Sequence, residues 1–407
     1  MRTDCSSDRL GFQRLGGREV RAVFDGGDIS SDGGGLLLRE VERHTQIIEQ
    51  FSRCFTDHRA SWLIEHSVRD LVAQRVLALA LGYEDLNDHD ALRHDPLLAA
   101  LVGKLDPKGE RRPVRDRGKA LAGKSTLNRL ELTPEAAGRD ARYKKIVLDH
   151  AAADRVLVDV FLQAHAEAPA EIILDLDATD DPLHGHQEGR FFHGYYKRYC
   201  YLPLYIFCGE FLLCARLRPA NIDAPAGSVE ELERIVGQIR AAWPETAITI
   251  RGDAGFCREA IMAWCEAHQV DYVLGLAKNT RLTATIEAEL ATAKQRFAQS
   301  GDASRVFAEF TYRTRNSWSR ARRVIAKAEH LHRGPNPRFV VTSLTASDIR
   351  WLYEDLYAAR GDMENRIKEQ QLYLFADRTS TAFLRSNQNR LYFSSVAYVL
   401  MQALRRL

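Results

Sequence analysis

The segment that most constrains the fold is a short apolar run, residues 171–179, in which two aspartates interrupt hydrophobic residues. It reads EIILDLDAT, and the alternation of a strand places Asp175 and Asp177 on one face and Leu174 and Leu176 on the other. Two carboxylates on one face of a core strand are costly to bury unless a cation neutralises them. The run therefore predicts a strand with an apolar face and an opposite face that attracts positive charge.

Upstream of residue 169 the pattern is helical. Apolar residues recur at helical spacing within residues 36–103, which are expected to form a small helical domain. Residues 104–123 are basic and contain Gly and Pro, which is typical of a linker or exposed arm. Residues 124–160 return to a helical pattern.

Downstream of residue 169, short β-favouring runs alternate with helical runs. A capping box, Ser228 with Glu231 three residues on, predicts the start of the first of these helices. The predicted order is three strands, a helix, a strand, a helix and a strand, followed by a long helical run over 349–374. This is the chain order of a ribonuclease-H-like α/β core, which is the expected fold class.

Two further acids have positions that suit a site shared with Asp177. Asp253 follows a predicted strand in a turn flanked by glycines, which let the backbone bend and a phosphate approach. Glu364 lies in the long helical run. Residues on its helix face are Tyr357, Arg360, Lys368 and Gln371, at about 100° per residue. A cap, a turn or a surface charge explains each acid taken alone, so only the combination indicates a site.

The chemistry of these three acids points to a divalent cation. Mg²⁺ prefers oxygen ligands and keeps part of its hydration shell for a substrate phosphate. Two such ions about 3.5–4 Å apart can activate the attacking oxygen and stabilise the leaving oxygen of a phosphodiester. We therefore predict two Mg²⁺ ions, with Mn²⁺ as a substitute. His184, His186 and His193 lack an acid or cysteine at matching spacing, so zinc is not expected.

Basic residues gather in two segments although the net charge is only +2. Residues 101–130 hold nine Lys and Arg against three acids, and residues 311–338 hold eight against the single acid Glu329. Such clusters are typical of phosphate-binding surfaces, although a solvated basic surface explains either one as well. Trp318, among the arginines of the second cluster, is equally compatible with base stacking and with a core position.

Composition indicates an ordinary globular protein, with 45% apolar and 28% charged residues. The first residues have no apolar segment of a secretory signal, and the longest apolar stretch is too short to span a bilayer. Seven cysteines without a CxxC pair argue against a disulfide framework or a zinc knuckle. We expect a cytoplasmic protein without a membrane partner.

The motifs around the three acids resemble those of DDE transposases encoded by bacterial insertion sequences. The first is Asp177-Ala178-Thr179, the second is Arg251-Gly252-Asp253-Ala254-Gly255-Phe256, and the third is Tyr357-x2-Arg360-x3-Glu364. The segments GYEDLNDH (82–89) and LHGHQ (183–187) narrow the resemblance to the insertion-sequence family numbered thirteen-eighty. The similarity runs from about residue 20 to the end of the chain.

The resemblance implies a division of the chain into four parts. Residues 1–103 would form an N-terminal helical, DNA-binding domain, and 104–168 a basic linker with a helical connector. Residues 169–277 and 345–407 would form the ribonuclease-H-like catalytic core, and 278–344 an insertion that is β-rich in its later part.

The resemblance also implies an enzyme that cleaves transposon-end DNA and transfers the freed 3′-OH into target DNA. Asp177, Asp253 and Glu364 would be both the catalytic residues and the metal ligands. The partners would be double-stranded DNA, as terminal inverted repeats and as target, and further copies of the chain at paired ends in the bacterial nucleoid. The residues expected to contact DNA are Tyr357, Arg360, Lys368, Lys197, Arg198, Lys278, Arg320, Arg322 and Arg323.

Two departures from the family pattern keep rival hypotheses open. Gln371 stands where the motif's final Lys belongs, and Lys368, one turn earlier on the same face, is expected to take over its phosphate contact. The chain stops after Leu404–Leu407, where similar proteins continue into a basic tail, so truncation is expected. The rivals are a truncated or domesticated DNA-binding protein without catalysis, and a ribonuclease-H-like nuclease.

Overall fold

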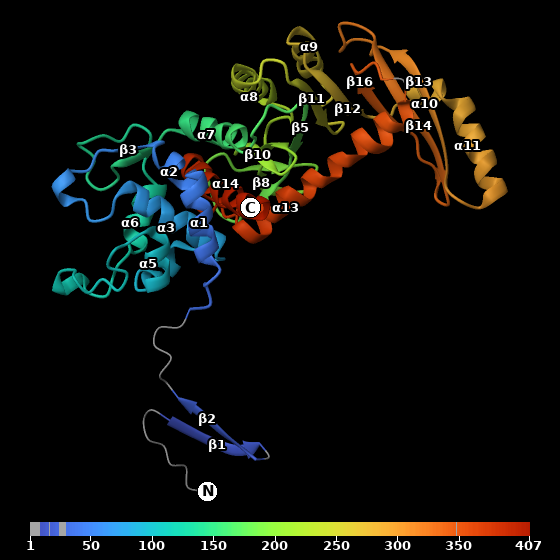
Figure 1. Ribbon diagram of the computed structural model, residues 1–407. Helices are drawn as coiled ribbons and strands as arrows, with labels where there is room; N and C mark the ends of the chain where they lie inside the picture. Colours follow the sequence, from blue (N-terminus) through green and yellow to red (C-terminus); the bar gives the residue numbers. More distant parts are fainter. Residues whose placement is uncertain (1–8, 16, 24–29, 347) are drawn as a thin grey trace.

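A nine-stranded mixed sheet organises the computed structural model, which describes residues 9–15, 17–23, 30–346 and 348–407 (Figure 1). Three central strands are parallel, and every other neighbouring pair in the sheet is antiparallel. The strands in spatial order are β10 (Phe211–Arg216), β9 (Leu204–Cys208), β5 (Glu171–Ala178), β11 (Ala247–Gly252), β12 (Asp271–Leu276), β16 (Arg338–Thr342), β14 (Arg322–Leu331) and β13 (Ser304–Tyr312), with β15 (Gly334–Pro335) paired to β14.

One face of the sheet is covered by helices α8 (Ser228–Ala242) and α9 (Glu259–Ala267), together with part of α7 (His150–Gln163). Leu174 and Leu176 of β5 belong to this apolar core. Helices α10 (Thr280–Thr285) and α11 (Glu287–Ser300) precede β13, and α11 packs on β13 and β14. The alternation predicted for β5 is therefore confirmed, since its leucines face this core and its aspartates face the other side.

The opposite face is covered at its two ends and crossed by a helix between them. Helix α14 (Leu384–Arg406) packs at the β10 end, and the segment after β16 packs on Val273, Ile325 and Val340 at the other. Helix α13 (Gly361–Leu374) runs between these ends and contacts β5 (Figure 1). The two aspartates of β5 lie on this face.

Helices from the N-terminal third surround α14 rather than forming a core of their own. One hydrophobic cluster joins them to α14 and to Tyr205 and Phe207 of β9. The elements of this region are α1 (Gly35–Thr45), α2 (Ile47–Ser52), α3 (Val68–Ala80), α4 (His89–Leu92), α5 (Pro96–Val102) and α6 (Lys124–Glu131), the short helices η1 (Ser61–Leu63), η2 (Leu86–Asp88) and η3 (Val114–Asp116), and the strand pair β3 (Phe55–Asp57) and β4 (Ile146–Leu148). A hairpin of β1 (Arg9–Leu15) and β2 (Arg18–Val23) precedes them and lies apart from this cluster (Figure 1).

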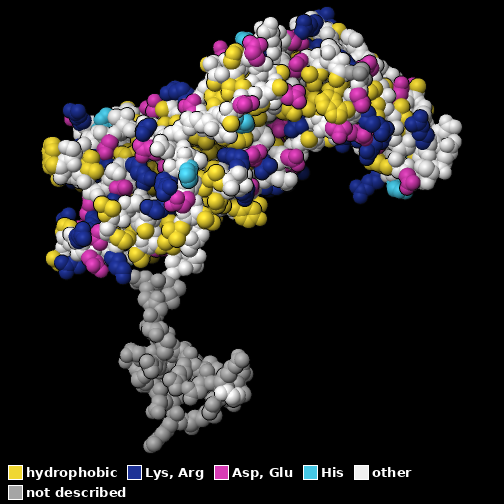
Figure 2. All heavy atoms as spheres, viewed as in Figure 1, with side chains coloured by type: hydrophobic (Ala, Val, Ile, Leu, Met, Phe, Trp, Pro, Cys, Tyr) yellow, Lys and Arg dark blue, Asp and Glu magenta, His cyan; other side chains and the backbone are white. Residues whose placement is uncertain are grey.

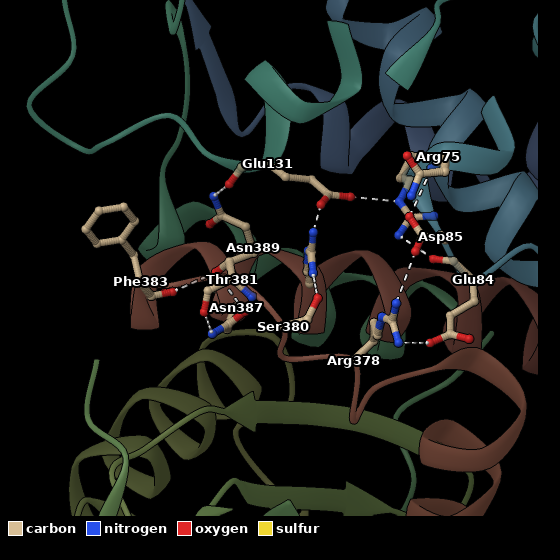
Figure 3. A network of polar contacts seen from close by, with 12 residues as sticks. Arg75, Glu84, Asp85, Glu131, Arg378, Ser380, Thr381, Phe383, Asn387 and Asn389 are labelled. Carbon is tan, nitrogen blue, oxygen red and sulfur yellow. Dashed lines mark hydrogen bonds and ion pairs between the residues drawn. The ribbon is translucent and has the colours of Figure 1, made fainter. Parts of the chain in front are cut away.

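Ion pairs fasten this helical region to the end of the chain (Figure 3). Glu131 of α6 accepts from Arg75 of α3 and from Arg390 of α14, both at 2.8 Å. The chain between α13 and α14 is held by Arg378, which pairs with Glu84 at 3.1 Å and with Asp85 at 3.0 Å. Because Glu131 is fully buried, loss of either arginine would leave its charge undercompensated.

Two local predictions are wrong. The helix predicted to begin with a capping box does begin at Ser228, but Gly227 is the N-cap, and Glu231 pairs with Arg216 and Arg234 instead of capping. The long helical run is also interrupted. It consists of α12 (Ile349–Trp351), a π-helical turn η4 (Leu352–Tyr357), a 3₁₀ turn η5 (Ala358–Arg360) and α13. The periodicity of apolar residues could not reveal the π turn, because the sequence keeps a helical spacing through the turn and through α13.

Within the described part of the chain, no helix combines the length and the apolar character needed to cross a membrane. The cysteines at the described positions are all free thiols.

Candidate active site

The two aspartates of β5 have different surroundings although they share a face. Asp175 is buried and lies beside Arg251 of β11, its partner in the strand register, whose Nε and Nη2 donate to its two oxygens at 2.5 and 2.7 Å. Asp177, at the end of the strand, lines an open pocket, and its Oδ1 accepts from the Ala178 N–H at 2.8 Å. Asp175 is thus occupied by an internal partner, while Asp177 faces the pocket.

Asp253 follows β11 in a tight turn that its own carboxylate stabilises. Its Oδ1 accepts from the Gly255 N–H at 2.8 Å, and a Cβ on Gly255 would lie 2.9 Å from that oxygen. A Cβ on Gly252 would meet Phe256 at 3.1 Å. These glycines therefore make room for the carboxylate and for Phe256, a packing reason that differs from the phosphate approach predicted from the sequence.

Glu364 reaches the pocket from the first turn of α13, and half of its side chain is exposed to solvent. Arg360 lies between the carboxylates, with its guanidinium 3.7 Å from Asp177 and 3.6 Å from Glu364. Lys368 and Gln371 line the same pocket, and Gln371 Nε2 donates to the Asp180 carbonyl at 3.4 Å.

Tyr357 lies before the start of α13, so the predicted helix face is not part of one continuous α-helix. It lies in the π turn, where its hydroxyl would be 2.5 Å from a Cβ on Gly275 of β12. The π turn and the 3₁₀ turn shift the helical register between Tyr357 and Arg360, so a uniform 100° spacing does not hold across them. Burial, first of all, raises the pKa of the Tyr357 hydroxyl.

The pocket that these side chains share has a volume of about 570 Å³. It brings together three acids that come from β5, from the turn after β11 and from α13. Burial raises the pKa of Asp177 to about 6; the nearby Arg360 opposes the shift, and the charges of Asp253 and Glu364 add to it. The pocket is therefore a place where negative charge is concentrated and a cation would be stabilised.

The donors fit a hard cation in kind, because all three acids offer carboxylate oxygens. Within the described residues, however, no three His, Cys, Asp or Glu side chains are grouped closely enough to hold a metal ion. Arg360 stands between Asp177 and Glu364, as the distances above show. Cation binding would therefore require these side chains to draw together.

An aromatic hairpin forms one wall of the pocket. Strands β7 (Phe191–His193) and β8 (Arg198–Tyr201) belong to a small sheet with β6 (Asp181–Pro182), and the loop between β7 and β8 places His193, Tyr195 and Tyr196 at the pocket. Tyr195 is 83% exposed. Lys197 is exposed and has a φ of 54°, and Arg198 lies 3.6 Å from Asp180.

The predicted basic surface of the insertion is partly neutralised: four of its eight basic residues pair with carboxylates, whereas Arg313, Arg315, Arg333 and Arg338 are exposed. Arg320 is 61% exposed and pairs with Glu266. Arg322 is only 2% exposed and lies between Glu259 and Glu266, so its guanidinium is not available to a DNA phosphate. Arg323 points the opposite way and binds Glu309 and two backbone carbonyls. On the face drawn in Figure 2, Lys and Arg side chains are interspersed with Asp and Glu rather than gathered in one stripe.

The structure shows the surroundings of Trp318 and Lys278. Trp318 is buried in the core formed with α8 and α9, where it packs edge-on against Tyr312. Lys278 is exposed in the turn between β12 and α10, and the neighbouring Asn279 caps α10 by accepting from the Leu282 N–H. Asp223, in a loop after β10, also lines the pocket and was not predicted, because nothing in its surrounding sequence marks it.

The two segments 82–89 and 183–187 meet at the chain between α13 and α14. Glu84 and Asp85 bind Arg378 there, as described above. Gln187 Nε2 donates to the Thr379 carbonyl at 3.2 Å, and the neighbouring Glu188 N–H donates to the Ala382 carbonyl at 2.8 Å. Both segments therefore hold the chain that follows the helix carrying Glu364.

Comparison with known proteins relates nearly the whole chain to transposases. A family model described as transposase DDE domain group 1 matches residues 12–407. Among solved structures, a cryo-EM structure of a piggyBac transposase synaptic complex with hairpin DNA is similar at 10% identity and a TM-score of 0.39, covering 91% of this chain and 81% of that chain. No curated protein matches the chain. The family model includes every element that carries a pocket acid.

Proposed function

The chain belongs to the transposase DDE domain group 1 family, and from this membership we propose that it cuts the ends of its own mobile element and joins the freed 3′-OH to target DNA. The observation that carries the proposal is the meeting of Asp177, Asp253 and Glu364 in one pocket. A single pocket can serve both steps, because each is an in-line displacement at a phosphodiester.

The strand order supports a ribonuclease-H-like core. Numbered along the chain from β5, the first five core strands lie in the spatial order 3-2-1-4-5, with the first and fourth adjacent and parallel. This order brings the ends of β5 and β11, and hence Asp177 and Asp253, side by side. We propose that 169–277 and 345–407 form this core, that 278–344 are an insertion, and that the helical residues before 104 bind DNA.

The three acids are the proposed ligands of divalent cations, Mg²⁺ or in its place Mn²⁺. When bound, the ions would supply charge stabilisation for the attacking and leaving oxygens. The protein's own part is to hold the three carboxylates around the scissile phosphate. We expect the guanidinium of Arg360 to move from the carboxylates to a DNA phosphate as this happens, since a charged fork suits both partners.

Proposed DNA contacts follow from exposure around the pocket. Lys368 and Arg360 lie within it, Lys197 and Arg198 on the hairpin beside it, and Lys278 and Arg320 at more distant exposed positions. Arg322 and Arg323 are left out of this set because internal acids already bind them. The segments 82–89 and 183–187 support the narrower assignment to the insertion-sequence family numbered thirteen-eighty. We also propose that several copies of the chain assemble on the paired transposon ends.

The test begins with the DNA that flanks the gene, which should carry short inverted repeats. A duplex bearing such a repeat should be cleaved in Mg²⁺ or Mn²⁺, and bound without cleavage in Ca²⁺. Asp177→Ala, Asp253→Ala and Glu364→Ala should each abolish cleavage while gel-shift affinity stays within a few-fold of wild type. Asp302→Ala, an exposed acid after α11, is the matched control and should cleave normally.

Two results would contradict the proposal. Undiminished cleavage in excess EDTA would exclude a cation-dependent mechanism. Binding of the repeats by a wild-type protein that never cleaves them would favour the rival hypothesis of a DNA-binding protein without catalysis.

A further inference from the structure

Arg251 bonds to two different elements with one guanidinium. On one side its Nε and Nη2 donate to both oxygens of Asp175 on β5, at 2.5 and 2.7 Å. On the other side its Nη1 donates to the backbone carbonyl of Leu356 in the π turn η4, at 2.5 Å. The side chains of Asp175 and Arg251 are both buried, so water does not compete for these hydrogen bonds.

Each partner lies a short way along the chain from a pocket acid. Asp175 precedes Asp177 by two residues on β5, and Arg251 precedes Asp253 by two residues on β11. Leu356 belongs to the segment that leads through η5 into α13 and Glu364. The three bonds of Arg251 therefore join the three elements that carry the acids.

The π turn η4, which Arg251 contacts, is the least regular of the three elements that Arg251 joins. The cap N–H of Ala358 donates to the carbonyl of Tyr353, five residues back, as in a π turn. Such turns are rare and occur mostly within helices at functional sites. A helix entered through a π turn and a 3₁₀ turn is less constrained by its own hydrogen bonds, so a side-chain donor from the sheet can decide where it starts.

We propose that Arg251, oriented by Asp175, is a positioning residue that sets the placement of Glu364 relative to Asp177 and Asp253. This inference rests on the proposed function, which assigns the chemistry to those three acids. The guanidinium is suited to the role because its planar fork binds the carboxylate with two donors and leaves a third for the carbonyl. A lysine offers a single ammonium and cannot keep that geometry.

A role limited to stability makes a different prediction. A buried ion pair can often be replaced by apolar side chains of similar volume with little loss of stability. The double variant Asp175→Leu with Arg251→Met removes both buried charges and the bond to Leu356, while keeping the volume. If the pair only stabilises the fold, this variant should work as well as wild type.

The test compares wild type, the double variant and Arg251→Lys, with Arg234→Met as the matched control. Arg234 also pairs with a carboxylate, Glu231, and donates to carbonyls of two other elements, but it lies on the far side of the sheet. Cleavage rate, DNA affinity and melting temperature are measured for each, and backbone hydrogen exchange is followed over 352–374 by mass spectrometry.

We expect the double variant to melt near the wild-type temperature and to bind DNA normally. Its cleavage rate should fall by about a hundredfold, the effect expected when a reacting group is displaced by about 1 Å. Exchange should accelerate over 352–364 and remain unchanged in α8 and α9. Arg251→Lys should cleave faster than the double variant but more slowly than wild type. Arg234→Met should leave the exchange over 352–364 unchanged.

Wild-type cleavage by the double variant, or wild-type exchange over 352–364, would overturn the proposal. If the double variant does not fold, the same two measurements on Arg251→Lys decide the matter. If wild type itself does not cleave DNA, the proposed function fails, but the exchange experiment still shows whether Arg251 holds the start of α13.

Discussion

Replacing Asp177 by Asn should stabilise the protein in the absence of metal, although it destroys the proposed site. The Asp177 carboxyl is 17% exposed, and burial is the main reason that its pKa rises from 3.8 to about 6. The charges of Asp253 and Glu364 contribute in the same direction, and Arg360 opposes them. Since each pKa unit corresponds to about 1.4 kcal/mol, the ionised carboxylate costs on the order of 3 kcal/mol of folding free energy.

The sign follows from proton linkage. Between pH 3.8 and about 6 the native carboxyl holds a proton that the unfolded chain has released, so stability falls as the pH rises through this window. Asn has no such penalty, and its Oδ1 can still accept from the Ala178 N–H. Asp177→Asn should therefore raise the free energy of unfolding by up to about 3 kcal/mol at pH 8 and leave it nearly unchanged at pH 3.5.

The assay is urea unfolding in EDTA over this pH range, with Glu266→Gln as a control of opposite sign. Burial works against the charge of Glu266, but hydrogen bonds from Arg322, Arg320 and Tyr272 outweigh it and lower its pKa to about 2. That carboxylate contributes stability above pH 4.5 that is lost as the pH falls, so Glu266→Gln should destabilise the protein at pH 7. An Asp177→Asn gain that is absent at pH 8, or equal at every pH, would refute the reasoning.

Adding Mg²⁺ should cancel most of this difference in stability between the two proteins. Wild type should gain about 2.7 kcal/mol at a concentration one hundred times its dissociation constant, and Asp177→Asn should gain much less. An equal gain in both proteins would mean that the ion binds elsewhere.

Further predictions concern the basic residues. Lys368→Ala should slow cleavage strongly in a single-turnover assay with little change in gel-shift affinity, because one contact near the acids affects the position of the scissile phosphate more than total binding. Gln371→Lys should leave the cleavage rate unchanged or raise it. A large loss of cleavage in Gln371→Ala, together with a normal rate in Lys368→Ala, would show that residue 371 makes the phosphate contact. Arg320→Ala should weaken DNA binding and flatten its salt dependence by about 0.9 log–log units if it contacts one phosphate. Arg322→Ala should instead lower the free energy of unfolding by about 3–5 kcal/mol without flattening that slope, because it leaves acids without their partner; urea titration and salt-dependent binding separate the two.

Local pattern in the sequence determined the features that depend on neighbours along the chain. The alternation at Leu174–Asp177 sorted the apolar and acidic faces of β5 correctly, because side-chain direction in a strand depends only on position. The motifs around Asp177, Asp253 and Glu364 indicated the DDE transposase family, and the family model confirms that coarser assignment. Their spacing along the chain, however, could not say how close the acids lie.

Tertiary structure decided everything that depends on partners distant in sequence. Arg320, Arg322 and Arg323 were predicted to belong to a phosphate-binding surface, but Glu259, Glu266 and Glu309, which lie on another helix and another strand, pair with them.

The same reason explains why two alternating aspartates proved different. Asp175 meets Arg251 only because β5 and β11 are neighbours in register, whereas Asp177 lies at the strand end where the pocket opens. The π turn before Glu364 could not be predicted for a related reason, because its residues keep helical spacing in the sequence. The hydrogen bond from Arg251 to the Leu356 carbonyl in this turn joins residues that are distant in the sequence.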